Sequence, residues 1–221
     1  MKGKIGNVLN TFQTLYFQSR SLRRCSRRVL SLDAFLADNS AQAACQPADG
    51  SVSVDLGSGL HPKNPFNATS VLGVDLRAEA SSNILAADLC FDGIPLEDSA
   101  VDFVTAFDFI EHVPRVVRVE SRTVYPFIQL MNEIYRVLKP HGLFLGSTPA
   151  YPSKQAFQDP THVNIITEDT FPLYFCSRSH SQGDLMARMY GFDGDFQVVD
   201  QAWVHDAWLV TIMQSQKTVS I

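Results

Sequence analysis

The chain has 221 residues, of which 45% are hydrophobic, and its formal net charge at pH 7 is −5. This length and composition predict a single globular domain with a sizeable core. No stretch approaches the roughly eighteen unbroken apolar residues that a membrane-spanning helix requires. The four cysteines have no paired spacing, which indicates neither a disulfide framework nor a zinc knuckle. We therefore expect a cytoplasmic protein with reduced thiols.

Positive charge is concentrated near the amino terminus. Seven basic residues precede the first acidic residue, Asp33, so the rest of the chain sets 11 of the 18 basic residues against all 23 acidic ones. Residues 7–18 also carry apolar side chains at helical spacing. We expect a basic helical segment over residues 1–45, followed by the domain at residues 46–221. This segment would pack on the domain or make a peripheral contact with a membrane surface, and its composition is also typical of an organelle transit peptide.

The most informative motif begins at residues 52–54, a mostly apolar run that Asp55 closes and that Gly57 and Gly59 follow. Buried parallel strands have such runs, and glycines allow a tight turn and a close approach of the backbone to a ligand. The dinucleotide fingerprint requires a third glycine three residues after the second, but Pro62 stands there. The motif therefore predicts a ligand without a pyrophosphate.

Three further predicted strands end in carboxylates. Residues 71–75 end at Asp75, twenty residues after Asp55, where an acidic side chain can accept hydrogen bonds from both hydroxyls of a ribose. Residues 83–88 end at Asp88, and residues 99–108 end at Asp108. In open α/β sheets ligands bind outside the carboxyl ends of the strands, so the pattern predicts a nucleoside site along that edge.

Five segments follow one another in a familiar order. They are Asp55-Leu-Gly-Ser-Gly59, Gly73-Val-Asp75, Ala87-Asp88-Leu89, Phe107-Asp-Phe-Ile-Glu-His-Val113 and Glu133-Ile-Tyr-Arg-Val-Leu-Lys-Pro140. In content and order they resemble the class I S-adenosylmethionine-dependent methyltransferases, in particular the type 11 group of small-molecule methyltransferases. The resemblance implies a three-layer, Rossmann-like α/β fold with a seven-stranded sheet, mostly parallel, whose last strand is antiparallel.

The same resemblance implies S-adenosylmethionine as the cofactor and assigns its contacts. The methionine part would contact Asp55, Gly57, Ser58 and Gly59, and the ribose would contact Asp75 with Leu76. The adenine would lie by Asp88 with Leu89, and Phe107 with Asp108 would pass beside the sulfonium.

Two features depart from the family pattern. Pro62 and Pro65 prevent the long first helix that usually follows the glycine turn, so we expect residues 61–70 to be mostly loop. This shortened loop resembles a subset of these enzymes that methylates bacterial surface sugars. His141 stands where the family commonly has glycine, although Gly142 remains to make the turn.

Beyond the shortened loop, the pattern predicts a helix over residues 126–138 and a fifth strand over residues 142–146. A closing hairpin is predicted from residues 196–203 and 207–213.

Acidic and imidazole side chains follow the fourth predicted strand. If the segment is helical, Asp108 shares a face with Glu111 and His112, and His162 follows in the sequence Asp159-Pro-Thr-His162. Two carboxylates could hold Mg²⁺, and some methyltransferases with a similar Glu-x-x-Glu-His pattern bind Mg²⁺ there together with a later His. Alternatively His112 or His162 removes the acceptor's proton while Glu111 orients the ring. In a third interpretation both His only satisfy loop hydrogen bonds.

Residues around the predicted acceptor side have two interpretations each. The aromatic residues at 151, 157, 174 and 175 would form an apolar wall around the acceptor or belong to the core. Arg115, Arg118 and Arg122 would bind a phosphate of the acceptor or form a solvated face.

The sequence disfavours several classes of methyltransferase. Residues 108–111 read Asp-Phe-Ile-Glu where an amino-directed nucleobase enzyme has Asn/Asp-Pro-Pro-aromatic, and no cysteine is placed for covalent attack on cytosine. The acidic body argues against a nucleic-acid partner. We expect methylation of a hydroxyl of a small molecule, such as a sugar of a surface polysaccharide or glycolipid. The alternatives are a nitrogen or carbon atom of a metabolite as acceptor, or a non-catalytic scaffold that binds S-adenosylmethionine.

Overall fold

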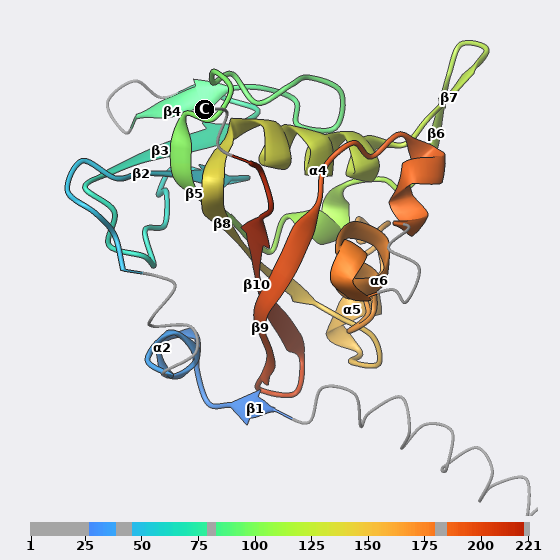
Figure 1. The fold of residues 1–221 in the computed structure, drawn as a ribbon. Coiled ribbons are helices and arrows are strands. Elements are labelled where there is room, and N and C mark those ends of the chain that lie inside the picture. The colour runs from blue at the N-terminus through green and yellow to red at the C-terminus, as the bar shows by residue number, and fades with distance from the viewer. Residues whose placement is uncertain (1–26, 39–45, 79–82, 180–184, 219–221) are drawn as a thin grey trace, which may run out of the picture.

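An eight-stranded sheet forms the centre of the computed structural model, which describes residues 27–38, 46–78, 83–179 and 185–218 (Figure 1). In spatial order the strands are β1 (Arg28–Val29), β9 (Phe196–Val204), β10 (Trp208–Ser215), β8 (Leu138–Pro149), β5 (Val101–Phe107), β2 (Val52–Leu56), β3 (Ser70–Asp75) and β4 (Ile84–Ala86). The strands from β8 to β4 are parallel, whereas β10 is antiparallel to both of its neighbours. The predicted fold class is confirmed, with eight strands in place of seven.

The order of the strands places a switch point between β2 and β5. The chain runs outward from β2 through β3 to β4 and then returns to β5 on the other side of β2. Leu56 at the end of β2 pairs with Ala106 near the end of β5, and Val74 on β3 pairs with Leu56 from the other side. The carboxyl ends of these strands therefore meet at one edge, and in open α/β sheets ligands bind at such a switch point.

Helices cover one face of the sheet. They are α4 (Pro126–Val137), α5 (Gln155–Gln158), α6 (Thr170–Phe175) and the 3-10 helices η3 (Ser177–Ser179) and η4 (Met186–Tyr190), with α4, α5 and α6 on the same side in Figure 1. The predicted helix is confirmed as α4, which begins at Pro126, where proline needs no hydrogen-bond partner for its nitrogen. Met131 and Ile134 of α4 are fully buried in the larger of two hydrophobic clusters, which also contains Phe171 and Phe175 of α6.

The opposite face has a much thinner cover, consisting of α2 (Leu32–Leu36) and residues 61–69. Residues 61–69 form a loop, as predicted, and the side chain of Asn64 closes it by bonding both the N–H and the carbonyl of Ala68. Phe66 then stacks on Phe103 of β5 with ring centroids 4.5 Å apart. Phe35 of α2 is also fully buried in this second cluster. A loop and one short helix thus replace the usual helical layer.

The eighth strand, β1, comes from the basic amino-terminal segment. It pairs in parallel with the end of β9, and two basic residues bind acidic residues next to it. Arg27 contacts Asp200 and Asp38, and Arg28 forms an ion pair with Asp206. A two-residue strand has no periodicity to detect, which is why pattern analysis missed it. Residues 7–18, for which a helix was predicted, lie outside the described residues.

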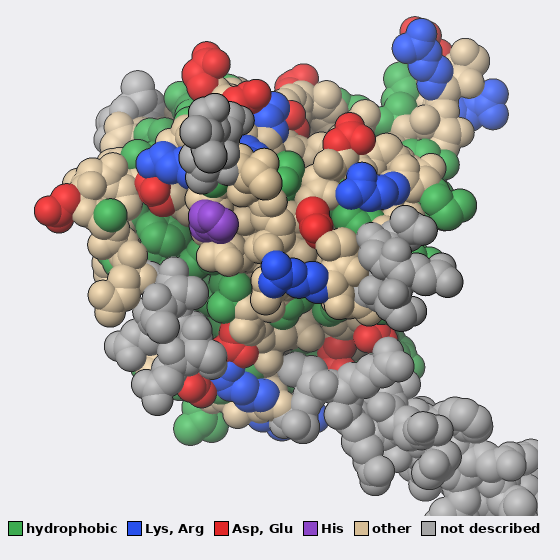
Figure 2. All heavy atoms as spheres, viewed as in Figure 1, with side chains coloured by type: hydrophobic (Ala, Val, Ile, Leu, Met, Phe, Trp, Pro, Cys, Tyr) green, Lys and Arg blue, Asp and Glu red, His purple; other side chains and the backbone are tan. Residues whose placement is uncertain are grey.

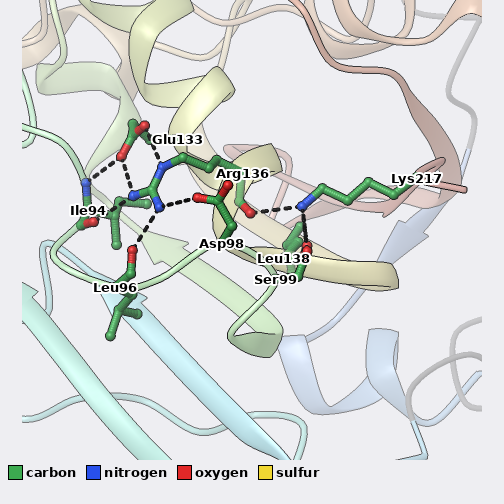
Figure 3. A network of polar contacts seen from close by, with 8 residues as sticks. All are labelled: Ile94, Leu96, Asp98, Ser99, Glu133, Arg136, Leu138 and Lys217. Atoms are coloured by element: carbon green, nitrogen blue, oxygen red, sulfur yellow. Dashed lines mark hydrogen bonds and ion pairs between the residues drawn. The ribbon is translucent and has the colours of Figure 1, made fainter. Parts of the chain in front are cut away.

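A polar network lies at the amino ends of β5 and β8, on the edge opposite the switch point (Figure 3). The Arg136 guanidinium on α4 binds the carboxylates of Glu133 and Asp98 and the carbonyls of Ile94 and Leu96. The Lys217 ammonium binds the Ser99 hydroxyl and the carbonyls of Arg136 and Leu138. We call these eight residues the amino-edge network.

A small hairpin of β6 (Val117–Val119) and β7 (Arg122–Val124) projects away from the body. Figure 2 shows Lys and Arg side chains at its tip, where Arg118 and Arg122 are exposed. Arg115 lies outside this hairpin and binds the side chain of Asn164 and the carbonyl of Ile165. The three arginines are therefore not one patch. No helix among the described residues is long and apolar enough to cross a membrane.

Candidate active site

Asp55 is buried at the switch point, and both of its oxygens are used within the protein. Oδ1 accepts a hydrogen bond from the Thr105 hydroxyl on β5 at 2.7 Å, and Oδ2 accepts one from the Lys63 N–H at 2.8 Å. Burial raises the pKa of Asp55, and these two bonds oppose that rise. Asp55 therefore joins β2, β5 and the loop at 61–69. Sequence analysis missed Thr105, although a threonine inside a buried apolar strand was a detectable signal.

The glycine turn lies between β2 and the end of β3. Gly57 has φ +65° and donates its N–H to the Val74 carbonyl at 2.8 Å. A Cβ at Gly57 would meet the Phe109 ring at 2.5 Å, so the ring after β5 packs directly on this glycine. Gly59 donates its N–H to Asp75 Oδ2 at 3.0 Å. The two glycines are thus needed for backbone conformation, and at Gly57 also for the close approach of Phe109.

The other candidate cofactor contacts occupy successive strand ends. Asp75 ends β3 and keeps acceptor capacity beyond its bond to Gly59, because a carboxylate has about four lone-pair sites. Leu76 is 71% exposed next to it. Asp88 follows β4 and accepts the Cys90 N–H, whereas Leu89 is buried. These residues lie along the edge that the sequence predicted.

Asp108 does not join Glu111 and His112 on a helix face. Only Ile110–His112 form a 3-10 helix (η2), and Asp108 precedes it with φ +50°. Its Oδ1 accepts a hydrogen bond from the Trp208 indole at 2.6 Å. The condition for a shared face, a helical segment from Asp108 onward, is not met, because a left-handed residue separates the strand from the turn. Trp208 lies 100 residues away, and no local pattern points to it.

A different cluster forms from Glu111, His112 and His162. One carboxylate oxygen and one nitrogen from each ring lie within 4.8 Å of one another. The imidazole rings meet edge to face with centroids 4.9 Å apart. Backbone bonds hold the two segments together, since the Glu111 carbonyl accepts the N–H groups of Val163 and Asn164, both at 2.9 Å. We call these three residues the Glu–His–His cluster.

The hydrogen bonds of His112 define its tautomer. Thr161 Oγ1 lies 3.0 Å from His112 Nδ1 and 2.7 Å from Asp159 Oδ1. The hydroxyl has one hydrogen, which it donates to the Asp159 carboxylate, so it accepts a hydrogen bond from His112 Nδ1. Bonds from Thr161 also lower the pKa of Asp159, which keeps it ionised. The lone pair of neutral His112 is then on Nε2, where it can accept a proton.

Glu111 has an unfavourable environment for a charge. Its side chain is buried, Oε2 accepts the Thr148 hydroxyl at 2.8 Å, and Oε1 has no hydrogen-bond partner among the described residues. Burial raises the pKa of Glu111, and the negative charge of Asp108 adds to the rise. The buried Nδ1 of His162 also has no partner among the described residues. Such groups are uncommon in native proteins and are typical of functional sites.

The cluster does not fit the magnesium site that two carboxylates would make. Mg²⁺ prefers six oxygen ligands in octahedral geometry. The cluster offers one carboxylate and two imidazoles, and the predicted second carboxylate, Asp108, binds Trp208 instead. We therefore derive no step through a metal ion.

The predicted aromatic wall is split in two. Tyr151 and Phe157 pack against each other and are exposed, after β8. Tyr174 and Phe175 line a different cavity of about 450 Å³ between α4, α6 and η4, with Arg115 at its rim. Phe175 also belongs to the core, as the second interpretation expects, whereas an acceptor wall stays a prediction.

Comparisons with known proteins agree with this geometry. A family model described as a methyltransferase domain matches residues 54–146. No curated protein matches the sequence. One solved structure that resembles it is a chain of the complex between the Haloferax volcanii Trm112 methyltransferase activator and a methyltransferase. The two chains share 16% identity with a TM-score of 0.51, and the match covers 84% of this chain and 94% of that chain.

Two more structures have similar scores. YcgJ from Bacillus subtilis shares 14% identity over 80% of this chain and 96% of its own, with a TM-score of 0.52. The [4+2]-cyclase SpnF shares 14% identity over 77% of this chain and 76% of its own, with a TM-score of 0.50. At such identities the structures establish the fold, and the family match contributes the activity. Residues 54–146 therefore match a methyltransferase domain, and the fold around them is that of the class I S-adenosylmethionine-dependent methyltransferases.

Proposed function

We propose that this methyltransferase acts on a hydroxyl group of a small molecule, with a sugar of a polysaccharide or glycolipid as the favoured acceptor. The observation that carries the proposal is the pair of contacts that Thr161 Oγ1 makes with His112 Nδ1 and with the Asp159 carboxylate, which occupy Nδ1 and leave Nε2 of the ring for the acceptor. An alcohol holds its proton tightly near neutral pH, and a positioned base contributes about 10² to 10⁴ in rate. His112 would take that proton as the oxygen attacks the methyl group.

The rest of the Glu–His–His cluster supports this role. A positive charge that develops on His112 would lie beside the Glu111 carboxylate. The second ring, His162, would share the proton with His112. Asp159 and Thr161 are exposed or half-buried polar groups next to it, which suits an acceptor rich in hydroxyls. The short loop at 61–69 favours a sugar through its resemblance to enzymes that methylate surface sugars.

We place the cofactor across the ends of β2, β3 and β4. Its methionine part would lie by Gly57, Ser58 and Gly59, its ribose would bond Asp75, and its adenine would lie near Asp88 and Leu89. Phe107 and Asp108 would pass beside the sulfonium. In this arrangement Asp55 acts through the loop that it holds, because its oxygens bond Thr105 and Lys63. The methyl donor is already activated, so aligning oxygen, methyl carbon and sulfur does most of the remaining work.

One experiment tests both the class of acceptor and the role of the Glu–His–His cluster. The protein is incubated with radiolabelled S-adenosylmethionine and a cell extract, with and without a chelator, and the labelled product is identified. We expect an O-methylated, alkali-stable small molecule or glycolipid, formed equally in both conditions. If the chelator abolishes formation of the labelled product and a divalent cation restores it, the cluster binds a metal ion and does not act as the proton acceptor.

Cofactor placement has its own measurement. In calorimetry, Asp75→Ala should weaken binding of S-adenosylhomocysteine by about tenfold or more, because two hydrogen bonds to a charged acceptor are lost. Unchanged affinity would refute the ribose assignment and leave the acceptor proposal standing.

A further inference from the structure

The cavity of about 450 Å³ between α4, α6 and η4 has no role in the proton transfer proposed above. Its volume is typical of ligand pockets, which are lined mostly by hydrophobic and aromatic side chains with a few polar groups. Of the twelve described residues that line it, eight are hydrophobic or aromatic. The four polar ones are Arg115, Thr167, Asp169 and Thr170. The lining therefore suits an apolar ligand that also has a polar group.

The mouth of this cavity is apolar as well. Val116 and Tyr190 line the cavity and are 58% and 43% exposed, and Met189, which precedes Tyr190 on η4, is 84% exposed. Apolar side chains that are exposed together mark surfaces that a ligand, a protein or a membrane covers. A hydrocarbon chain that enters the cavity would cover Val116 and Tyr190 at the mouth, whereas a compact metabolite would fill the interior alone. The mouth therefore favours a chain.

Arg115 adds a cation at the rim of the cavity. Its Nε donates a hydrogen bond to the Asn164 side chain at 2.7 Å and its Nη2 donates one to the Ile165 carbonyl, which together fix the guanidinium. A guanidinium has five N–H donors, and these two contacts use two of them. No carboxylate oxygen of the described residues, Asp169 included, lies within 4.0 Å of the group. The remaining donors suit a phosphate, whose oxygens match the fork of the arginine.

Hydrogen bonds connect this rim to the Glu–His–His cluster. Asn164, which holds Arg115, donates its backbone N–H to the Glu111 carbonyl at 2.9 Å and its side-chain amide to the Ile110 carbonyl at 3.1 Å. Along the chain, Arg115 follows His112 by three residues. A ligand that extends past Arg115 would therefore have one end at the cluster and the other in the cavity.

We propose that the cavity binds the hydrocarbon chain of a lipid-linked acceptor, whose phosphate pairs with Arg115 and whose sugar hydroxyl lies at His112. This inference deepens the proposed function and rests on it, because it selects a phosphate-containing glycolipid among the sugars considered there. In such a lipid the phosphate joins the sugar to the chain, which is the order of the cluster, Arg115 and the cavity. A free sugar would leave the apolar lining uncovered.

Calorimetry on the full chain tests the site with three probes. They are decyl phosphate, decyl glucoside and inorganic phosphate, with the two decyl compounds kept below the concentration at which micelles form. We expect decyl phosphate to bind tighter than inorganic phosphate by about tenfold or more, because burial of each methylene group favours binding. It should also bind about tenfold tighter than decyl glucoside, because only the phosphate accepts charge-assisted hydrogen bonds from the arginine.

Substitutions separate the chain from the phosphate. Leu173→Trp fills the cavity and should weaken both decyl compounds by about tenfold, and Val116→Trp repeats the test at the exposed mouth. Leu30→Trp, at an 83% exposed leucine beside β1, is the matched control and should weaken neither. Arg115→Gln should remove only the preference for decyl phosphate over decyl glucoside, whereas Arg118→Gln on the hairpin should keep it. A cooperative thermal transition shows that each variant is folded.

Other results of the binding experiment overturn the proposal. Equal affinity of the wild type for decyl phosphate and inorganic phosphate excludes a site for the chain, as does tight binding that survives in both Leu173→Trp and Val116→Trp. If Arg115→Gln weakens decyl phosphate and decyl glucoside equally, the phosphate subsite is refuted, because the residue then only supports the segment that holds Asn164.

The labelled product of the extract experiment distinguishes this inference from the proposed function. We expect the product to be extracted into organic solvent, and its formation to fall in Leu173→Trp but not in Leu30→Trp. A labelled O-methyl sugar that stays in the water phase would overturn the lipid acceptor and leave the hydroxyl acceptor standing. Label on a nitrogen or carbon atom of an extracted lipid would refute the hydroxyl acceptor and support the site for the chain.

Discussion

The two polar clusters of this molecule lie at opposite edges of the same sheet and differ in how completely they are satisfied. In the amino-edge network the Arg136 guanidinium has four partners and the Lys217 ammonium has three (Figure 3). In the Glu–His–His cluster, Glu111 Oε1 and His162 Nδ1 are buried without a partner among the described residues. An unmade buried hydrogen bond costs about 1–3 kcal/mol. From this difference we expect the first cluster to stabilise the fold, and it supports our proposal that the second takes part in the reaction.

The two glutamates show the same contrast. Hydrogen bonds from Arg136 lower the pKa of Glu133, and the pKa of Arg136 is raised by the same contacts. Burial raises the pKa of Glu111, and the bond from Thr148 and the nearby His112 only oppose that rise. One carboxylate is thus favoured as an ion and the other is not. Substitutions in the two clusters should therefore affect different properties.

The largest expected effect is on catalysis. His112→Ala should lower the rate of labelled-product formation by about 10² to 10⁴, because the proton acceptor is lost. Binding of S-adenosylhomocysteine and the free energy of unfolding should change little. Thr161→Val, which removes the hydroxyl that links His112 to Asp159, should give a smaller drop. Wild-type rates in both variants would show that the cluster does not accept the proton.

The next effect is on stability. Arg136→Met should lower the free energy of unfolding by about 2–3 kcal/mol, since it leaves Glu133 and two carbonyls without their partner. Chemical denaturation measures this change, and affinity for S-adenosylhomocysteine in the folded protein should stay the same. Arg122→Ala on the exposed hairpin is the control, with a change within about 0.5 kcal/mol. A variant as stable as the wild type would mean that the network is not structural.

The smallest expected effect is that of a substitution at Glu111, which should change both the rate of methyl transfer and the free energy of unfolding. Glu111→Gln should slow methyl transfer yet raise stability at neutral pH by about 1 kcal/mol, because an unfavourable buried charge is removed. The folded-state pKa of Glu111 lies above its ordinary value of 4.5, so the native state binds its proton more tightly than the unfolded state. In the wild type, protonated Glu111 contributes fully to the free energy of unfolding below pH 4.5, and this contribution is lost as the pH rises through the raised pKa of the folded state.

Thermal unfolding at several pH values checks that sign. The difference in Tm between Glu111→Gln and the wild type should be near zero at about pH 4 and positive at about pH 8. Thr148→Val serves as a comparison, since it removes the hydroxyl that bonds Glu111 Oε2 and keeps the charge. A Tm advantage that is largest at acid pH would contradict the assigned environment of Glu111.

Most of the sheet was predictable, and so was the loop after the glycine turn. Buried parallel strands have apolar runs that end where the ligand edge begins, and Pro62 and Pro65 exclude a helix by their covalent geometry. The contacts at the site were less predictable. The helical face that would have grouped Asp108 with Glu111 and His112 does not form, and its bond to Trp208 joins residues 100 positions apart.

By itself the sequence determined the strands from β2 to β5 and the carboxylates at their ends, and hence the edge at which we propose that the cofactor binds, because these depend on local patterns of burial and backbone freedom. Only the tertiary structure decided which side chains meet there. It brought His162 to Glu111 and His112 and laid Lys63 over Phe107. Those contacts depend on how loops distant in the chain pack together, and no local pattern of residues contains that information.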